Sequence, residues 1–339
     1  MPPRQPRRHH TVPRLYLRAF ADRDQVLMRL RGRTADEIRN ITSVAFTRDF
    51  YGFTVGGVRD ATVENWLQRN VEDPAAPALR RVLEGQWPPT DEDRAVIGTF
   101  AAFQILRTPL VRDYMLQIDR VTGPLLWAAE LLKKALEQGD LTEDEKQQVL
   151  ADARARTPAA LTERADPRAL LRTMVREADR QVPRLLARSW TVLRAAEPVL
   201  VTSDNPIAKF FPQGPPAGFT GVAPPDAELH LPLDPSTLLV LERDGAAGPP
   251  GAPALTAELA AAANHAQALG AERAVLRHPA TPWPATLVLG PRPPRLPEPT
   301  ITTRTDIVGP PTFPATYPPV HDRRIADLLR DLDAEDTVR

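Results

Sequence analysis

Proline is concentrated in the second half of this 339-residue chain, where 25 of its 38 prolines lie between Pro198 and Pro319. Proline has a fixed φ and no backbone N–H, so it interrupts helices and sheet ladders alike. Long helices are therefore expected in the first half, and short strands, edges and loops in the second. From Pro279 to Pro319 there is little apolar periodicity, which is typical of a wrapping or disordered tail.

Apolar spacing in the first half predicts a helical body over residues 61–188. Residues 61–84 have helical periodicity, with an interruption expected near Pro74 and Pro77. Thr90 followed by Asp93 resembles a capping box and predicts a helix to about residue 107. Further helices are expected over 110–138 and, from an Asp-Pro start at 166–167, to about residue 188.

The periodicity changes after Ser189 and predicts short strands. The expected strands are 190–193, 199–202, 229–233, 238–242 and 273–278, with an earlier one at 25–31 and an alanine-rich helix over 256–269. The predicted fold class is α+β: a helical body with a small, mainly antiparallel sheet formed largely by the C-terminal half. The predicted domains are 1–280, helical over 61–188 and strand-rich over 189–280, and a proline-rich tail, 281–339, with a short terminal helix.

Composition excludes several classes of site. The chain has no cysteine, which excludes disulfides, thiolate metal sites and a cysteine nucleophile. It has 43 basic and 43 acidic residues, so no net charge attracts it to nucleic acid or membrane. No apolar run is long enough to span a bilayer. We expect a soluble, cytoplasmic protein that does not bind membranes, and the oligomeric state stays open.

The first candidate site contains two adjacent histidines. His9 and His10 precede Thr11, Val12 and Pro13, and Pro13 favours an extended backbone before it. Adjacent side chains of an extended segment point to opposite faces, so one imidazole is expected to face a pocket as a base or metal ligand. The alternative is a polar lead-in to the helix that follows, which carries Tyr16 and Phe20 on one face.

A second candidate is the stretch from Thr202 to Pro206, where an apolar strand ends in Ser203, Asp204 and Asn205. Side chains at strand ends are often presented to a cleft, which favours a site. Asp and Asn also bond to their own turns, so a purely structural role is the alternative.

Two single residues complete the candidates. Arg107 ends an otherwise apolar helix, so it must reach solvent or pair with an acid. The alternative to a functional role is that Arg107 complements the helix dipole. Asn264 is a polar residue among alanines in the 256–269 helix, and small neighbours would let another element approach it; a surface position for Asn264 and His265 is nevertheless favoured.

Together these stretches resemble the bacterial family catalogued as domain of unknown function 4238. The resemblance rests on His9–Pro13 with Tyr16, on Asp49–Tyr51, on Arg107–Pro109, and on Thr202–Pro206 followed by Leu231–Leu233. It spans roughly residues 8–280. It implies that both the histidine and the aspartate elements belong to the family's core, and it implies no activity.

Whether the protein is an enzyme stays open at this level. The first hypothesis is a phosphoester hydrolase acting on nucleic acid or a nucleotide, with the histidine segment lying against the aspartate stretch. His9, His10, Asp204 and Arg107 are its predicted catalytic residues. Its predicted substrate-binding residues are Tyr16, Ser203, Asn205 and Asn264. No cofactor is specified, although a divalent metal is compatible with this set.

The second hypothesis is a non-catalytic binding protein, regulatory or defensive, in which the same motifs are structural. A third is nucleic-acid binding by residues 1–33, which hold nine arginines and two aspartates.

Overall fold

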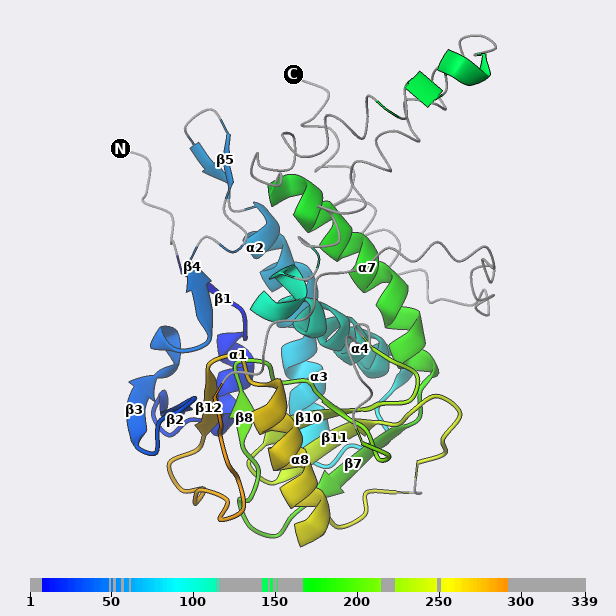
Figure 1. The fold of residues 1–339 in the computed structure, drawn as a ribbon. Coiled ribbons are helices and arrows are strands. Elements are labelled where there is room, and N and C mark those ends of the chain that lie inside the picture. Colours follow the sequence, from blue (N-terminus) through cyan, green and yellow to red (C-terminus); the bar gives the residue numbers. More distant parts are fainter. Residues whose placement is uncertain are drawn as a thin grey trace.

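The protein has an α+β fold, as its sequence predicts, with helices packed against small antiparallel sheets (Figure 1). The fold was obtained as a computed structural model. It describes residues 8–48, 50, 53–55, 58–60, 62–113, 115, 142–145, 147–148, 151, 167–214, 223–248 and 251–291. The main hydrophobic core draws on residues from Val12 to Leu276, so both ends of this range contribute to one cluster.

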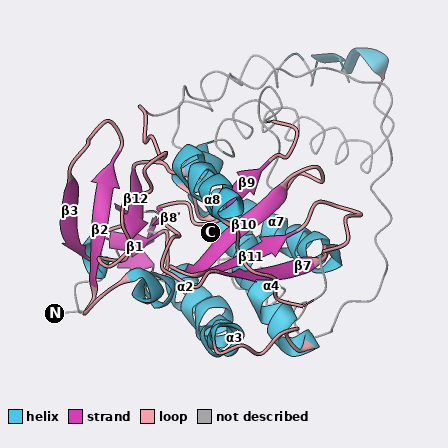
Figure 2. Ribbon diagram, turned by 90° about the horizontal axis from the view of Figure 1, so that it is seen from below, coloured by secondary structure: helices cyan, strands magenta, loops and turns pink. Residues whose placement is uncertain are grey.

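The first four-stranded sheet comes from the C-terminal half and has the order β7-β11-β10-β9. Its strands are β7 (Trp190–Arg194), β9 (Ala208–Phe210), β10 (Glu228–Asp234) and β11 (Thr237–Leu241). Figure 2 shows helix α8 (Ala257–Gly270) on one side of this sheet and helices α3 (Asp73–Leu83) and α4 (Asp91–Leu106) on the other. Both faces are therefore buried, which explains why β11 is a continuous apolar run.

The second four-stranded sheet has the order β3-β2-β12-β8 and joins the two ends of the core. Strands β2 (Gln25–Leu30) and β3 (Asp36–Asn40) come from the N-terminal part, whereas β8 (Thr202–Ser203) and β12 (Ala274–Arg277) come from the C-terminal part. The sequence predicted a strand at 25–31, but nothing local specified that Leu30 pairs with Ala274. Two short ribbons complete the strands: β1 (Arg8–His10) with β4 (Phe46–Arg48), and β5 (Phe53–Val55) with β6 (Val58–Asp60).

A short helical segment follows the histidine lead-in, and a longer series begins at residue 62. The first comprises α1 (Arg14–Leu17) and the 3₁₀ turn η1 (Arg18–Phe20), and a second 3₁₀ turn, η2, spans Ile41–Ser43. The series is α2 (Thr62–Leu67), the π-helical segment η3 (Gln68–Glu72) and α3 (Asp73–Leu83). The expected interruption near Pro74 and Pro77 is wrong: both prolines lie within α3, and the irregular turn precedes them. Pro74 is tolerated because the first turn of a helix needs no N–H donor.

Helix α4 (Asp91–Leu106) begins as predicted, because the backbone N–H of Asp93 donates to Thr90 Oγ1 over 3.1 Å. Nearly all of its residues from Ala95 onward are buried. It packs side by side with α7 (Pro167–Ala187), as Figure 1 shows. Gly98 permits this approach, since a Cβ at that position would lie 2.8 Å from Leu186 Cδ2.

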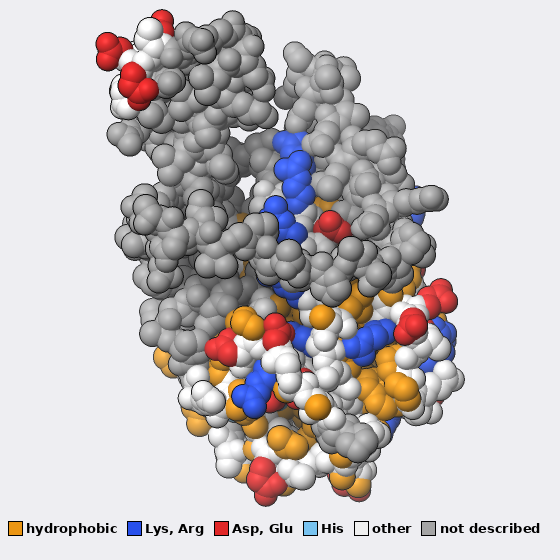
Figure 3. Space-filling model, turned by 90° about the vertical axis from the view of Figure 1, so that its right-hand side faces the viewer, with side chains coloured by type: hydrophobic (Ala, Val, Ile, Leu, Met, Phe, Trp, Pro, Cys, Tyr) orange, Lys and Arg blue, Asp and Glu red, His pale blue; other side chains and the backbone are white. Residues whose placement is uncertain are grey.

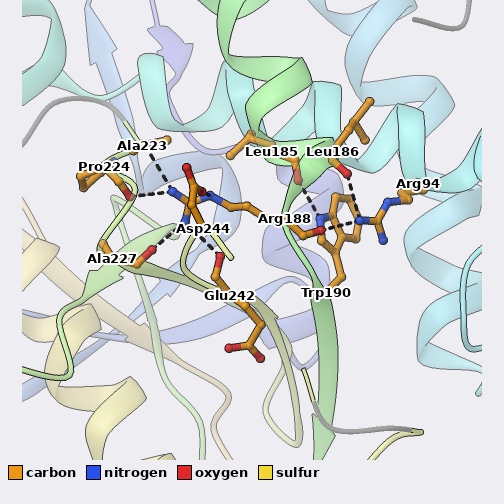
Figure 4. A network of polar contacts seen from close by, with 10 residues as sticks. All are labelled: Arg94, Leu185, Leu186, Arg188, Trp190, Ala223, Pro224, Ala227, Glu242 and Asp244. Atoms are coloured by element: carbon orange, nitrogen blue, oxygen red, sulfur yellow. Dashed lines mark hydrogen bonds and ion pairs between the residues drawn. The ribbon is translucent and has the colours of Figure 1, made fainter. Parts of the chain in front are cut away.

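Several arginines of this chain bond backbone carbonyls inside the fold. Figure 4 shows Arg94 donating to the carbonyls of Leu186 and Arg188 at the end of α7, while its guanidinium lies 4.5 Å from the centroid of the Trp190 ring. Arg188 is only 2% exposed, and its side chain donates to the carbonyls of Ala227 and Pro224 over 2.6 Å each.

The same use of arginine recurs at two other helix ends. Arg31 bonds carbonyls at the end of α8, and Arg194 bonds those of Val82 and Leu83 at the end of α3. A cation at a helix C-terminus satisfies carbonyls that have no partner within the helix and complements the dipole.

Other arginines face outward from α7. Figure 3 looks at the side of the molecule where α7 lies and shows a column of basic side chains. In the sequence of α7, Arg172, Arg176, Arg180 and Arg184 recur every fourth residue, and Arg180 lies 3.6 Å from Glu177.

The segment after residue 280 packs on the core as far as it is described. Leu287 and Leu289 join a cluster with Val201 and Val275, and the Trp283 indole N–H donates to the Leu287 carbonyl. The predicted tail from residue 292, its helix at 324–332 and most of the predicted helix 110–138 lie outside the described residues. Among the described helices, none combines the length and apolar character needed to cross a membrane.

Candidate functional site

The histidine lead-in is held between the turn before β4 and the C-terminal end of α4. In strand β1, His9 pairs with Thr47 and His10 with Phe46. The next residue, Thr11, donates its N–H to the Ala45 carbonyl over 2.9 Å and accepts from Gln104 Nε2 at its own carbonyl, also over 2.9 Å. The backbone of the lead-in is therefore bonded on both sides.

The two imidazoles have different surroundings, as expected for adjacent residues of an extended segment. His9 is buried, and its Nε2 lies 3.6 Å from Glu64 Oε2. His10 is half-buried, and burial together with the positive charges of Arg14 and Arg107 lowers its imidazole pKa below the usual 6.5. His10 is thus mainly neutral at pH 7, and its Nδ1 has no hydrogen-bond partner in the described part of the chain.

Arg107 finds the acidic partner that its buried position requires. Only 3% of the residue is exposed, and its guanidinium donates to Glu72 Oε1 over 2.6 Å and to the His10 carbonyl over 2.8 Å. Glu72 is the last residue of the π-helical segment η3. Arg107 therefore ties three elements together: α4, η3 and β1.

Asp204 receives a row of backbone N–H groups. Its Oδ1 accepts from Glu272 over 2.8 Å, and its Oδ2 accepts from Arg273 over 2.8 Å and from Ala274 over 3.3 Å. These three residues connect the end of α8 to β12, so Asp204 organises that connection. Burial raises the pKa of the Asp204 carboxyl to about 6, although the three N–H donors act in the opposite direction.

The remaining polar residues of the motifs bond to the chain itself. Asn264 is 3% exposed, so its expected surface position is wrong, whereas its neighbour His265 is exposed. Its side chain accepts from the Val201 N–H over 2.9 Å and donates to the Val199 carbonyl over 2.8 Å, as a neighbouring strand would.

Ser203, Asn205 and Tyr16 follow the same pattern. Ser203 Oγ lies 2.8 Å from Gln267 Oε1, and Asn205 Nδ2 donates to the Gly270 carbonyl over 3.0 Å. The Tyr16 hydroxyl donates to the Pro232 carbonyl over 2.6 Å. Each of these predicted substrate-binding residues thus has a partner within the fold.

A hollow of about 300 Å³ lies on one face of the β3-β2-β12-β8 sheet. Its floor is apolar, and its walls come from the turn before β4, from the lead-in and from the Asp204 region. We call it the hollow; it is lined by Thr11, Met28, Leu30, Glu37, Arg39, Ser43, Val44, Ala45, Phe46, Thr47, Pro109, Asp204, Glu272, Arg273, Ala274 and Leu276.

The hollow brings together only part of the predicted site. Thr11, next to the histidines, and Asp204 line it together, so the two motifs do meet around one cavity. Among the described residues, however, His9, His10 and Arg107 are not in its lining. His10 and Arg107 form a separate group with Glu72.

Sequence reasoning missed two acids, Glu72 and Glu272. A buried Arg107 requires an acidic partner, but the sequence does not indicate which acid it is. Glu272 lies two residues after the end of α8, and its only local signal is a charged residue near a helix end. Within the described ranges, no three His, Cys, Asp or Glu side chains come together as a metal site, and a divalent metal stays a prediction.

Comparison with known proteins places the chain in a family without assigning a reaction. No curated protein and no solved structure matches it. Residues 8–281 match the family described as "Protein of unknown function (DUF4238)", a range that runs from β1 through the hollow's last lining residue. The chain therefore belongs to the DUF4238 family.

Proposed function

We propose that the protein binds a small molecule in the hollow and that the family motifs form the frame of this binding site. The observation that carries the proposal is Asp204, which lines the hollow while its carboxylate accepts three backbone N–H groups. A carboxylate used in this way supports the wall of a cavity. A regulatory or defence role in the cytoplasm is the cellular setting that we propose for such a binding protein.

Two properties of the hollow favour ligand binding. Its volume of about 300 Å³ matches the lower range of small-molecule sites. It also combines an apolar floor, made by Met28, Leu30 and Leu276, with a few charged groups at its edges. This combination is typical of sites in which apolar contact supplies affinity and polar groups fix orientation.

A pair of tryptophan variants tests the proposal. Leu30→Trp places a bulky side chain on the floor of the hollow. Ile38→Trp is its matched control, since Ile38 lies on the same sheet, is 70% exposed, and alternates with Glu37 and Arg39, which line the hollow. Thermal shifts are measured with a metabolite library on the wild type and both variants.

We expect ligands that raise the Tm of the wild type and of Ile38→Trp but not of Leu30→Trp. A ligand at 100 times its Kd stabilises the folded state by about 2.7 kcal/mol, which a thermal shift detects readily. The proposal fails if no ligand stabilises the wild type, or if every stabilising ligand acts equally on folded Leu30→Trp.

Phosphoester hydrolysis is the second candidate, and one observation favours it. The lowered pKa of His10 gives a half-buried imidazole that is neutral at pH 7, as a general base requires. This base would act beside Arg14 and Arg107, not with Asp204. Hydrolysis of bis(4-nitrophenyl) phosphate by the wild type, lost in a folded His10→Gln variant, would favour this function over the binding protein.

A further inference from the structure

We infer, building on the proposed binding function, that the hollow selects a small organic cation: an ammonium or guanidinium group carried on an apolar body. The positive group would lie beside Asp204 and Glu272, and the apolar body would lie on the sheet floor. The ligand class follows from how charge is distributed over the buried and the exposed parts of the lining.

The buried end of the hollow is acidic. Asp204 and Glu272 line it, and each is only 8% exposed. A carboxylate has about four acceptor positions, and Asp204 uses three of them, two at Oδ2 and one at Oδ1. These three bonds leave one acceptor position of Oδ1 unused, which a donor in the ligand would take under this inference.

The other charges of the lining lie at its solvent side. Arg39 and Glu37 pair with each other, and their side chains are 50% and 40% exposed. Arg273 is also exposed; its charge lowers the pKa of the Asp204 carboxyl, but it acts less strongly than the three N–H donors because solvent and salt screen it. Because the two carboxylates are the buried charges of the lining and the two arginines are exposed, we expect a cation to be favoured over an anion.

The desolvation of these acids supplies the driving force. Burial already raises the pKa of the Asp204 carboxyl to about 6, because the ionised form is poorly solvated there. A neutral ligand would displace water and leave both acids less solvated, whereas a cation would pair with them. The apolar body gains its affinity from Met28, Leu30 and Leu276 in either case.

Three probes with one aromatic body separate the effect of charge from that of shape: phenethylammonium, 2-phenylethanol and 3-phenylpropionate. Their Kd values are measured by calorimetry at pH 7.5 on the full chain. We expect phenethylammonium to bind at least about tenfold more tightly than the alcohol, a difference of about 1.4 kcal/mol. The propionate is expected to bind most weakly.

Two conservative variants locate the charge. Glu272→Gln is expected to weaken phenethylammonium binding about fivefold or more and to leave 2-phenylethanol nearly unchanged. Glu197→Gln is the control, because Glu197 is an exposed acid outside the lining of the hollow; it is expected to change the Kd less than about twofold.

The pH dependence gives an independent readout. Phenethylammonium keeps its charge across pH 5–8, as a lysine amine does. The charged and titratable groups that line the hollow with Asp204 are Glu272 and Arg273, next to it, and Glu37 and Arg39 from β3. Binding is expected to strengthen between pH 5 and 7.5, as Asp204 loses its proton, and to do so much less for 2-phenylethanol.

The outcomes separate this inference from the proposed function. If 2-phenylethanol or 3-phenylpropionate binds as tightly as the ammonium, and Leu30→Trp abolishes that binding, the cation inference is wrong while the hollow remains a binding site. The same holds if no probe binds but library ligands act through the hollow. If neither probes nor library ligands bind, the proposed function itself is wrong.

Discussion

The Tyr16 hydroxyl oxygen lies 2.8 Å from Thr202 Oγ1, which joins the helix after the histidine lead-in to the strand before Asp204. The same hydroxyl donates to the Pro232 carbonyl. Because a phenol has one hydrogen, Thr202 is the donor in the pair with Tyr16. Thr202 is fully buried, so this contact holds together two motifs that are 186 residues apart in sequence.

Removing that hydroxyl should destabilise the protein. Tyr16→Phe keeps the ring but leaves the Pro232 carbonyl and the Thr202 hydroxyl buried with lost partners, so unfolding should require about 1–3 kcal/mol less free energy. Urea denaturation measures the change. In a double-mutant cycle, Thr202→Val should cost less when Tyr16→Phe is already present than it does in the wild type; equal costs would contradict the contact.

Replacing Asp204 by its amide isostere, asparagine, should lower the free energy of unfolding. Asn has one acceptor oxygen in place of two, so Asp204→Asn turns an N–H donor toward the N–H groups of the 272–274 segment. We expect a loss of about 2–3 kcal/mol in unfolding free energy and faster amide hydrogen exchange in that segment. Ser203→Ala, one residue away, is the control, and it should leave exchange at 273 and 274 nearly unchanged.

The same carboxyl has a definite effect on stability with pH. Its folded pKa, about 6, lies above the ordinary value of 3.8, so the folded state holds the proton more tightly than the unfolded state does. Asp204 therefore contributes a stability that decreases as pH rises from about 4 to 6. Comparing the pH profiles of the wild type and Asp204→Asn should show this decrease only in the wild type.

Arg107 and Glu72 should behave as a buried pair whose members depend on each other. Arg107→Met leaves Glu72, whose side chain is 16% exposed, without its 2.6 Å partner, and we expect a loss of about 3–5 kcal/mol. Adding Glu72→Gln should recover at least about 1 kcal/mol, because the uncompensated charge is then gone. Additive losses in the double variant would contradict this coupling, which equilibrium unfolding measures directly.

Local sequence signals accounted for elements whose causes are local. Thr90 capping Asp93 and the helix start at Pro167 depend on neighbouring residues, and both were found. The split of the strands into two sheets was not found, because the pairing of β2 with β12 joins residues far apart in sequence. Asn264 was misplaced for the same reason: its partners, Val199 and Val201, belong to another element.

The site was predictable as a meeting of motifs but not as a set of chemical roles. Residue types suggested that Asp204 and Arg107 could act on a substrate, and the same types serve equally well to bond backbone groups. The role depends on what each side chain contacts. Asp204 accepts the three N–H groups of residues 272–274 and Arg107 donates to the His10 carbonyl, and a residue pattern does not indicate such backbone partners. Arginine illustrates the point, since Arg31, Arg94 and Arg194 each bond the end of a distant helix.

The pKa of the His10 imidazole should be lowered in the folded state, whereas neighbouring acids would raise the pKa of an imidazole. Burial and the charges of Arg14 and Arg107 lower its folded pKa below 6.5, so the unfolded state binds the proton first as pH falls. The contribution of His10 to stability is therefore lost as pH decreases through 6.5 toward that lowered value, and His10→Gln should flatten this part of the pH profile of stability.

NMR titration of the imidazole checks the cause: Arg14→Gln, an exposed substitution, should raise the pKa of His10. A His10 pKa at or above 6.5 in the wild type would show that the positive charges and burial do not govern it, and would also remove the one observation that favours a neutral base at this position.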